Sequence, residues 1–186
     1  MSTIAKLRGI DFDRMVERGA FADLESIKVE LIYGELRFMN RAGPVHDGEI
    51  EFLVDWSYAN TDRRKISIRV QSSINCGEHR PEPDLVWSQK MPSKRLRPTH
   101  EHILLLIEVA DSSIESDLNE KAKLYAEHLI PEYWVVDVPA ELVHIHRMPR
   151  DGQYQSIQSL GKSEFVSPLC QPTARLSLAE LFDLDS

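Results

Sequence analysis

The chain has 186 residues, of which 42% are hydrophobic and 28% charged, and its formal net charge is −8. This length suffices for one domain with a substantial core, and the acidic balance argues against nonspecific coating of nucleic acid, which draws on surplus Lys and Arg. The longest apolar run is far shorter than the roughly 18 residues of a membrane span, so we expect no membrane contact. Cys76 and Cys170 lie in no metal-binding spacing, which favours reduced thiols in a cytoplasmic protein.

The first part of the chain mixes helical and extended patterns. Phe12–Leu24 is typical of a short helix of mixed charge, and Lys28–Met39 indicates a β-hairpin with its turn at Tyr33-Gly34. Val45–Asn60 carries apolar residues at a helical spacing. Lys65–Ile74 alternates between apolar and polar residues, which predicts a strand with one polar face.

The middle of the chain predicts a parallel crossover. Pro81–Trp87 and Ile103–Val109 are expected to be strands, Asp117–His128 a helix, and Glu132–Val138 a strongly apolar strand. Because a helix separates the last two strands, we expect them to be parallel.

The end of the chain adds a further strand and a helix. Leu142–Met148 is expected to pair with the preceding strand through a short turn, and Leu176–Leu184 predicts a terminal helix capped by Ser177. The pattern as a whole predicts a mixed α/β sheet with helices available for both faces.

Two carboxylates fall at the ends of predicted strands. Asp84 opens one strand and Glu108 lies near the end of the next, so an antiparallel pairing would bring both to one edge of the sheet. Converging carboxylates raise each other's pKa unless they hold a cation, and oxygen ligands of this kind suit Mg²⁺ or Mn²⁺. The alternative is that Asp84 is a turn residue and Glu108 a solvated strand end.

A lysine on the following helix can complete this group. Lys121 lies four residues before Tyr125, on the face expected to contact the sheet, and can therefore point back towards Glu108. Two carboxylates, a divalent cation and an ammonium form a site for metal-assisted attack of water on a phosphodiester, with the lysine orienting or deprotonating the water. The alternative is a solvated helix residue beside Glu120.

Several stretches around these residues resemble one family. The chain is similar to the bacterial Uma-type family, labelled as restriction endonucleases, of the PD-(D/E)XK nuclease superfamily, from about residue 21 to the C-terminus. The stretches that carry the resemblance occur in the family's order: "VELIYGELRFM", "PVH", "VQSSI", "EPDLV", "LIEVADSSIESDLNEKAKLYA" and "IPEYWVVD".

The resemblance implies roles for individual residues. The Pro-Asp of the superfamily motif falls on Pro83-Asp84 and its (D/E) position on Glu108, making both metal ligands, with the Val109 carbonyl as a third. The motif lysine is missing, since Val109-Ala110 occupies its place. Related families take the lysine from the following helix, which implies Lys121, with Lys123 as the weaker candidate.

Three further residues match positions that line the site in such proteins. Gln71 lies on the polar face of its predicted strand, Glu35 follows the glycine of the hairpin turn, and His46 opens the first core helix. Their alternative roles are structural: a strand residue, a hairpin-edge glutamate and a histidine at a helix N-terminus.

The resemblance also implies an architecture and a function. We expect a restriction-endonuclease-like fold over residues 1–186, with an N-terminal helix and hairpin (1–44), a core (45–148) and a C-terminal extension (149–186). The implied function is a Mg²⁺- or Mn²⁺-dependent endonuclease acting on DNA as a homodimer. Two alternatives remain open: a noncatalytic module that binds nucleic acid or protein, and an interaction protein whose exposed hairpin mediates dimers.

Other polar and aromatic residues have simpler interpretations. His144 and His146 alternate with apolar residues on a strand, and we expect exposed strand residues rather than a metal site. Tyr133 and Trp134 are expected to pack in the core and against the sheet rather than to stack on bases.

Overall fold

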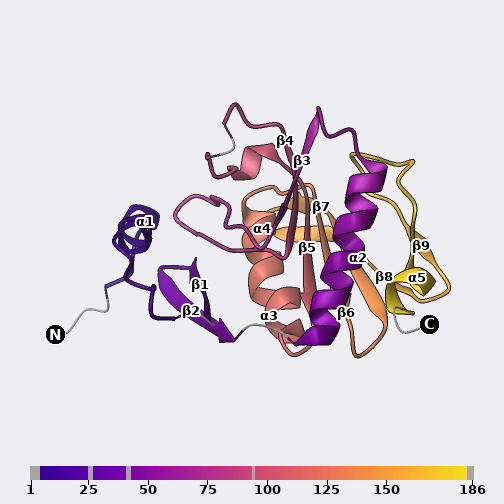
Figure 1. Cartoon of the computed structure of the whole chain (residues 1–186), viewed down its shortest axis with the longest axis horizontal. Helices are drawn as coiled ribbons and strands as arrows, with labels where there is room; N and C mark the ends of the chain where they lie inside the picture. Colours follow the sequence, from indigo (N-terminus) through magenta and orange to yellow (C-terminus); the bar gives the residue numbers. More distant parts are fainter. Residues whose placement is uncertain (1–4, 25–26, 41–42, 94, 184–186) are drawn as a thin grey trace.

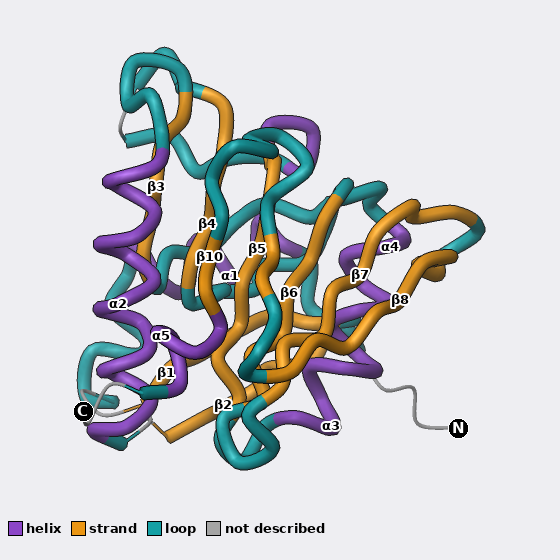
Figure 2. Tube along the Cα trace, turned by 90° about the vertical axis from the view of Figure 1, so that its right-hand side faces the viewer, coloured by secondary structure: helices purple, strands orange, loops and turns teal. Residues whose placement is uncertain are grey.

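The computed structural model describes residues 5–24, 27–40, 43–93 and 95–183. Its centre is a six-stranded mixed sheet in the order β3-β4-β5-β6-β7-β8, which runs across Figure 2. The strands of this sheet are β3 (Ile66–Val70), β4 (Leu85–Gln89), β5 (Ile103–Ala110), β6 (Glu132–Asp137), β7 (Leu142–Arg150) and β8 (Gln153–Gly161).

The pairing directions follow the predicted connections. Strand β4 is antiparallel to β5, with Leu85 opposite Ile107. Strand β5 is parallel to β6, with Glu108 opposite Val135, as expected for strands joined by a helical crossover. The predicted mixed sheet flanked by helices is therefore confirmed.

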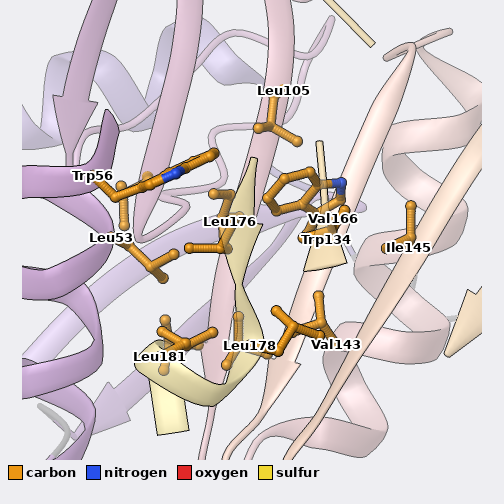
Figure 3. Packing of buried hydrophobic residues seen from close by; sticks show 14 of the residues in the cluster. Leu53, Trp56, Leu105, Trp134, Val143, Ile145, Val166, Leu176, Leu178 and Leu181 are labelled. Atoms are coloured by element: carbon orange, nitrogen blue, oxygen red, sulfur yellow. The ribbon is translucent and has the colours of Figure 1, made fainter. Parts of the chain in front are cut away.

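One face of the sheet is covered by α2 (Pro44–Asn60) and α5 (Leu178–Phe182), beside the short strands β9 (Phe165–Val166) and β10 (Leu176–Ser177). Figure 3 shows Trp56 of α2 and Leu181 of α5 packing towards Trp134 of β6 in this core. Trp134 and Tyr133 are both fully buried, so their prediction as packing residues is confirmed.

The opposite face is covered by a continuous helical stretch composed of α3 (Ile114–Ser116), the π-helical turn η2 (Asp117–Lys121) and α4 (Ala122–Glu127). The inner residues of α4 are fully buried against the sheet: Leu124, Tyr125 and Ala126. Alternate residues of the central strands therefore face two different apolar layers, which explains their near-continuous hydrophobic sequence.

The N-terminal part forms a separate ribbon. Strands β1 (Ile27–Ile32) and β2 (Glu35–Asn40) form the predicted hairpin, with Tyr33 (φ 50°) and Gly34 (φ 80°) at its turn. Two successive residues with positive φ fit a type I′ turn, which matches the twist of the strands. Strand β2 points towards the ends of α2 and α3 (Figure 1), and Arg37 Nη2 of β2 donates to Glu120 Oε1 of η2 at 2.9 Å.

Several boundaries differ from the expectation. Helix α1 spans Gly9–Glu17 and not residues 12–24, because the chain leaves the helix before Gly19, whose φ of 72° a helix does not allow. Strand β3 ends at Val70 because Gln71 has a φ of 43°. Ser177 caps α5 as predicted, by accepting a hydrogen bond from Glu180 N; the predicted end of that helix at Leu184 lies outside the described residues.

Several elements were not expected: the short 3₁₀ helix η1 (His100–His102), α3, and the strands β8, β9 and β10. Strand β8 lies within residues 149–186, so this segment contributes directly to the central sheet.

Cys76 is buried and Cys170 half-buried, and both are free thiols. Within the described ranges, no helix combines the length and apolar character needed to cross a membrane.

Candidate active site

The two predicted carboxylates are brought together by the antiparallel pairing of β4 and β5. Asp84 immediately precedes β4, and its Oδ2 accepts a hydrogen bond from Val109 N at 2.9 Å. Val109 directly follows Glu108 in β5, and the side chains of Asp84 and Glu108 are both buried. Burying two acids at one place is costly unless cations or donors surround them.

A lysine and a tyrosine from the helical stretch meet Glu108. Lys121 Nζ donates to Glu108 Oε1 at 2.9 Å, and the hydroxyl of Tyr125 donates to the same oxygen at 3.0 Å. Lys121 also lies 3.5 Å from Asp117 Oδ1. Asp117 and Lys121 are the first and last residues of the π-helical turn η2, a rare conformation that is frequent at functional sites.

The hairpin contributes two residues that the sequence did not indicate. Glu30 of β1 is fully buried, and its Oε1 lies 3.4 Å from Lys121 Nζ and accepts a hydrogen bond from Glu82 N at 2.6 Å. Lys28, two positions earlier on the same strand, lies 3.7 Å from Asp84 Oδ1. Their only signal in the sequence is a pair of charged residues alternating with Val29 in an otherwise apolar strand.

Helix α2 supplies a histidine. His46 Nε2 lies 3.4 Å from Asp84 Oδ2, so His46 contacts the cluster from the first turn of the helix. Burial opposes protonation of His46, but the hydrogen bond and charge of Asp84 outweigh it and raise its pKa. His46 is therefore one of the predicted site-lining residues that the structure brings to the carboxylates.

The pKa values of the two carboxyl groups are shifted in opposite directions. Burial alone would raise the pKa of Asp84, but His46, Lys28 and the Val109 amide lower it to about 2. Burial raises the pKa of Glu108 to about 8, although Lys121 acts against this shift. Pairs of acids whose surroundings separate their pKa values in this way are common in active sites.

The lysine of the cluster stays charged. Burial disfavours its ammonium form, but Glu108, Glu30 and Asp117 outweigh burial and raise the pKa of Lys121 well above its usual value. Lys121 is therefore a fixed positive charge at neutral pH, held by carboxylates on three sides.

The cluster has more acids than bases, which bears on whether a divalent cation fits. Its acids are Glu30, Asp84, Glu108 and Asp117, and its lysines are Lys28 and Lys121. Oε2 of Glu30 is buried without a hydrogen-bond partner among the described residues. Across the described ranges, no three His, Cys, Asp or Glu side chains already form a metal-holding group. Mg²⁺ needs only one or two protein carboxylates beside water and phosphate, so Asp84 and Glu108 fit such an ion.

Three candidates do not contact this cluster through their side chains. Glu35 is 53% exposed and pairs with Arg37 at 2.6 Å. The Gln71 side chain is exposed, while its backbone N donates to the carbonyl of Asp84 at 2.9 Å. Lys123 is 62% exposed and pairs with Glu127 at 3.8 Å, on the outer side of the helix.

One of the two strand histidines is not exposed as expected. His146 is buried, because its ring packs against those of Tyr133 and Tyr154 at centroid distances of 5.4 and 5.6 Å, so its prediction as an exposed residue was wrong. His144 is partly exposed and its Nδ1 lies 2.7 Å from Ser159 Oγ.

The fold is that of a nuclease-like protein. The chain is similar to the crystal structure of a putative nuclease belonging to DUF820 from Anabaena variabilis, with a TM-score of 0.71. The two sequences are 15% identical, and the similarity covers 84% of this chain and 90% of that chain. At this identity the likeness shows the fold alone.

The family is shown by the sequence. Residues 11–179 match the Uma2 family, described as a putative restriction endonuclease. The chain therefore belongs to the Uma2 family, as its motifs indicated. No curated protein matches the chain.

Proposed function

We propose that the chain is a metal-dependent endonuclease that hydrolyses DNA phosphodiester bonds, with Asp84 and Glu108 binding Mg²⁺ or Mn²⁺ and Lys121 positioning the attacking water. The observation that carries the proposal is the 2.9 Å hydrogen bond from Lys121 Nζ to Glu108 Oε1. It places a permanent positive charge beside one member of a buried carboxylate pair. The nuclease descriptions of the family and of the similar structure support the same reaction class.

Asp84 and Glu108, with the Val109 carbonyl as a third ligand, would hold the cation. When bound, a divalent cation lowers the pKa of a coordinated water and neutralises charge on the phosphate. Asp84 suits this role because its pKa of about 2 keeps it ionised at neutral pH. Val109 N and His46 occupy Oδ2 of Asp84, so Oδ1, which lies 3.7 Å from Lys28, is the oxygen that would bind the cation.

The environment of Lys121 supports one of its two expected roles. A general base must lose its proton near the working pH, whereas burial among three carboxylates raises the pKa of Lys121 well above its usual value. Lys121 therefore acts as a charged hydrogen-bond donor that orients water and stabilises negative charge as it develops, and does not accept the proton.

The proposal is tested by combining metal binding with plasmid nicking. Calorimetric titration of the wild type with Mg²⁺ or Mn²⁺ should show saturable binding, and the same preparation should nick supercoiled plasmid only with the metal. Asp84→Asn should abolish both, whereas Asp55→Asn, on an exposed position of α2, should leave both intact. Equal binding and nicking by Asp84→Asn and wild type would refute the assigned site.

A second candidate is a nuclease-fold module with little or no catalytic activity that binds nucleic acid or a protein partner. One observation favours it: both carboxylates already have lysine partners, Lys28 at 3.7 Å from Asp84 and Lys121 at 2.9 Å from Glu108. For such a module, the wild type would bind no metal in the titration, and Asp84→Asn would retain any binding to oligonucleotides.

A further inference from the structure

Strand β8 lies at an open edge of the central sheet. It pairs with β7 on one side only and is the last strand in the order of the sheet (Figure 2). In the part of the chain that the structure describes, the backbone hydrogen bonds beyond this pairing involve its two end residues: Gly161, which contacts Glu164, and Gln153, whose carbonyl accepts from the side chain of Gln155. Most side chains of β8 are exposed: Gln153, Gln155, Ser156, Ile157, Gln158 and Ser159.

The composition of β8 does not protect this edge against pairing with another strand. Edge strands usually carry charges, prolines or bulges that prevent pairing with another chain. The nine residues Gln153–Gly161 contain no charged residue and no proline. The opposite edge of the same sheet differs, because β3 carries Arg69 and directly follows Lys65.

We propose that β8 is an interaction surface for a second copy of this chain, with the two β8 strands paired antiparallel about a two-fold axis at Ile157. The two six-stranded sheets would then form one continuous sheet across the dimer. This proposal goes beyond the proposed nuclease chemistry and does not depend on it.

The register of the pairing follows from the position of Ile157. Ile157 is the middle residue of the nine-residue strand, so a two-fold axis at this position uses its full length. Ser156 would then lie opposite Gln158 of the second copy, and Gln155 opposite Ser159. These two pairs combine uncharged polar side chains, Tyr154 would lie opposite Leu160, and no charged side chains face each other anywhere along the strand. An isologous interface requires this self-complementarity.

The surroundings of β8 leave room for a partner on both faces of the sheet. A hollow of about 460 Å³ borders Gln158 and Leu160 on the face of α2 and α5, and another of about 500 Å³ borders Tyr154 and Ile157 on the face of α4. Ile157, which is 62% exposed, would be covered by its counterpart. Removing this apolar surface from water favours association.

The first test is the mass of the full chain in solution. Sedimentation equilibrium of the wild type over increasing concentration should give a mass rising from 21.4 kDa towards twice that value. Ile157→Lys should remain monomeric, because two like charges would face each other at the axis. The matched control is Ile10→Lys, which places the same charge on a 47% exposed isoleucine of α1 and should dimerise as the wild type does. Thermal melting of each variant checks that it is folded.

The second test measures the register. In a Cys170→Ser background, Ile157→Cys should form a disulfide-linked dimer under mild oxidation, because residues facing each other across the axis have neighbouring Cβ atoms. Gln153→Cys should not, because the eight-residue offset to its counterpart corresponds to about 27 Å along the strand.

A monomeric wild type at the highest concentration would overturn the proposal. So would a dimer that Ile157→Lys leaves intact, since its interface would then lie elsewhere, for example at the N-terminal hairpin. Cross-linking through Gln153→Cys but not Ile157→Cys would exclude this register.

Discussion

Lys121 Nζ donates a hydrogen bond to Glu108 Oε1 at 2.9 Å although 13 positions separate the two residues in the chain. The lysine comes from the π-helical turn η2 and the glutamate from β5, so the pair joins a helix to the sheet. The same contact lies beside Asp84, the other proposed metal ligand. Structural and chemical roles therefore overlap in this pair and must be separated by experiment.

Lys121→Met should reduce metal-dependent cleavage by roughly 10²–10³-fold, the effect typical of losing one donor that stabilises developing charge. Single-turnover nicking of supercoiled plasmid measures this loss. Lys123→Met is the matched control: the same substitution, two positions along, at a side chain that is 62% exposed. It should cut at the wild-type rate, and equal rates for Lys121→Met and wild type would remove Lys121 from the mechanism.

The stability of Lys121→Met requires a separate measurement, because three carboxylates lose their shared cation. Removing one member of a buried ion pair costs about 3–5 kcal/mol. Lys121→Met combined with Glu108→Gln leaves fewer buried charges without a partner, so we expect it to melt at a higher temperature than Lys121→Met alone while remaining inactive.

Glu108→Gln should stabilise the metal-free protein at neutral pH. Burial raises the pKa of Glu108 from 4.5 to about 8, so the folded state holds this proton more tightly than the unfolded state does. The contribution of Glu108 to stability is therefore complete below pH 4.5 and is lost as the pH rises through 8. The variant stays neutral throughout, so its advantage over the wild type should grow between these limits and then level off.

Calorimetric melting in metal-free buffer across this range measures the effect, with about 1.4 kcal/mol expected for each unit of pKa shift. Glu51→Gln, at an exposed position of α2, should show no such pH-dependent gain. A constant difference between Glu108→Gln and wild type from pH 4.5 to 8 would mean that Glu108 titrates normally in the folded protein.

Lys28→Met should strengthen Mg²⁺ binding. The ammonium of Lys28 lies 3.7 Å from Asp84 Oδ1, where it competes with and repels a divalent cation. We expect the Kd to fall about tenfold, or ~1.4 kcal/mol. Titration calorimetry measures the change, with Lys65→Met at an exposed position as the control. A weaker affinity would mean that Lys28 supports the geometry of the site more than it opposes the cation.

Arg147→Met should destabilise the fold, and this prediction does not depend on the proposed catalysis. Glu132 is fully buried, and its Oε1 accepts hydrogen bonds from Arg147 Nε at 2.8 Å and from Trp134 Nε1 at 2.9 Å. Loss of Arg147 leaves a buried carboxylate without its cation, which costs about 3–5 kcal/mol. Urea denaturation measures this loss. Arg150→Met, at an exposed pair with Asp151, should change stability by about 1 kcal/mol or less.

The sequence was most informative where periodicity and connection length decide the structure. The crossover between β5 and β6 required parallel strands, and the antiparallel pairing of β4 with β5 placed Asp84 beside the end of β5. The helical spacing of Lys121 and Tyr125 indicated that both point towards the sheet, and both contact Glu108. These relationships follow from local geometry within one supersecondary unit.

Residues brought to the site by tertiary contacts were less predictable. Lys28 and Glu30 reach the cluster because the hairpin docks through the bridge between Leu31 and Arg80, and no periodicity encodes that contact. The family resemblance pointed instead to Glu35, at the turn end of β2, whose side chain faces solvent and Arg37. Strand β8 was missed because an edge strand with most of its side chains exposed needs no alternation of apolar residues.

The hairpin lies outside the central sheet, yet it carries two members of the buried cluster. It is held by buried Leu31 and Ile32 and by several polar contacts, among them Tyr33 N to His79 Nδ1 at 2.9 Å and Arg37 Nη2 to Glu120 Oε1 at 2.9 Å. Because β1 and β2 form a sheet of their own, the ribbon can open as a local unit while the central sheet stays folded. Such an opening would withdraw Lys28 and Glu30 together and admit solvent to the carboxylates. Hydrogen exchange of the β1 amide protons would therefore measure how often the buried cluster is exposed to water.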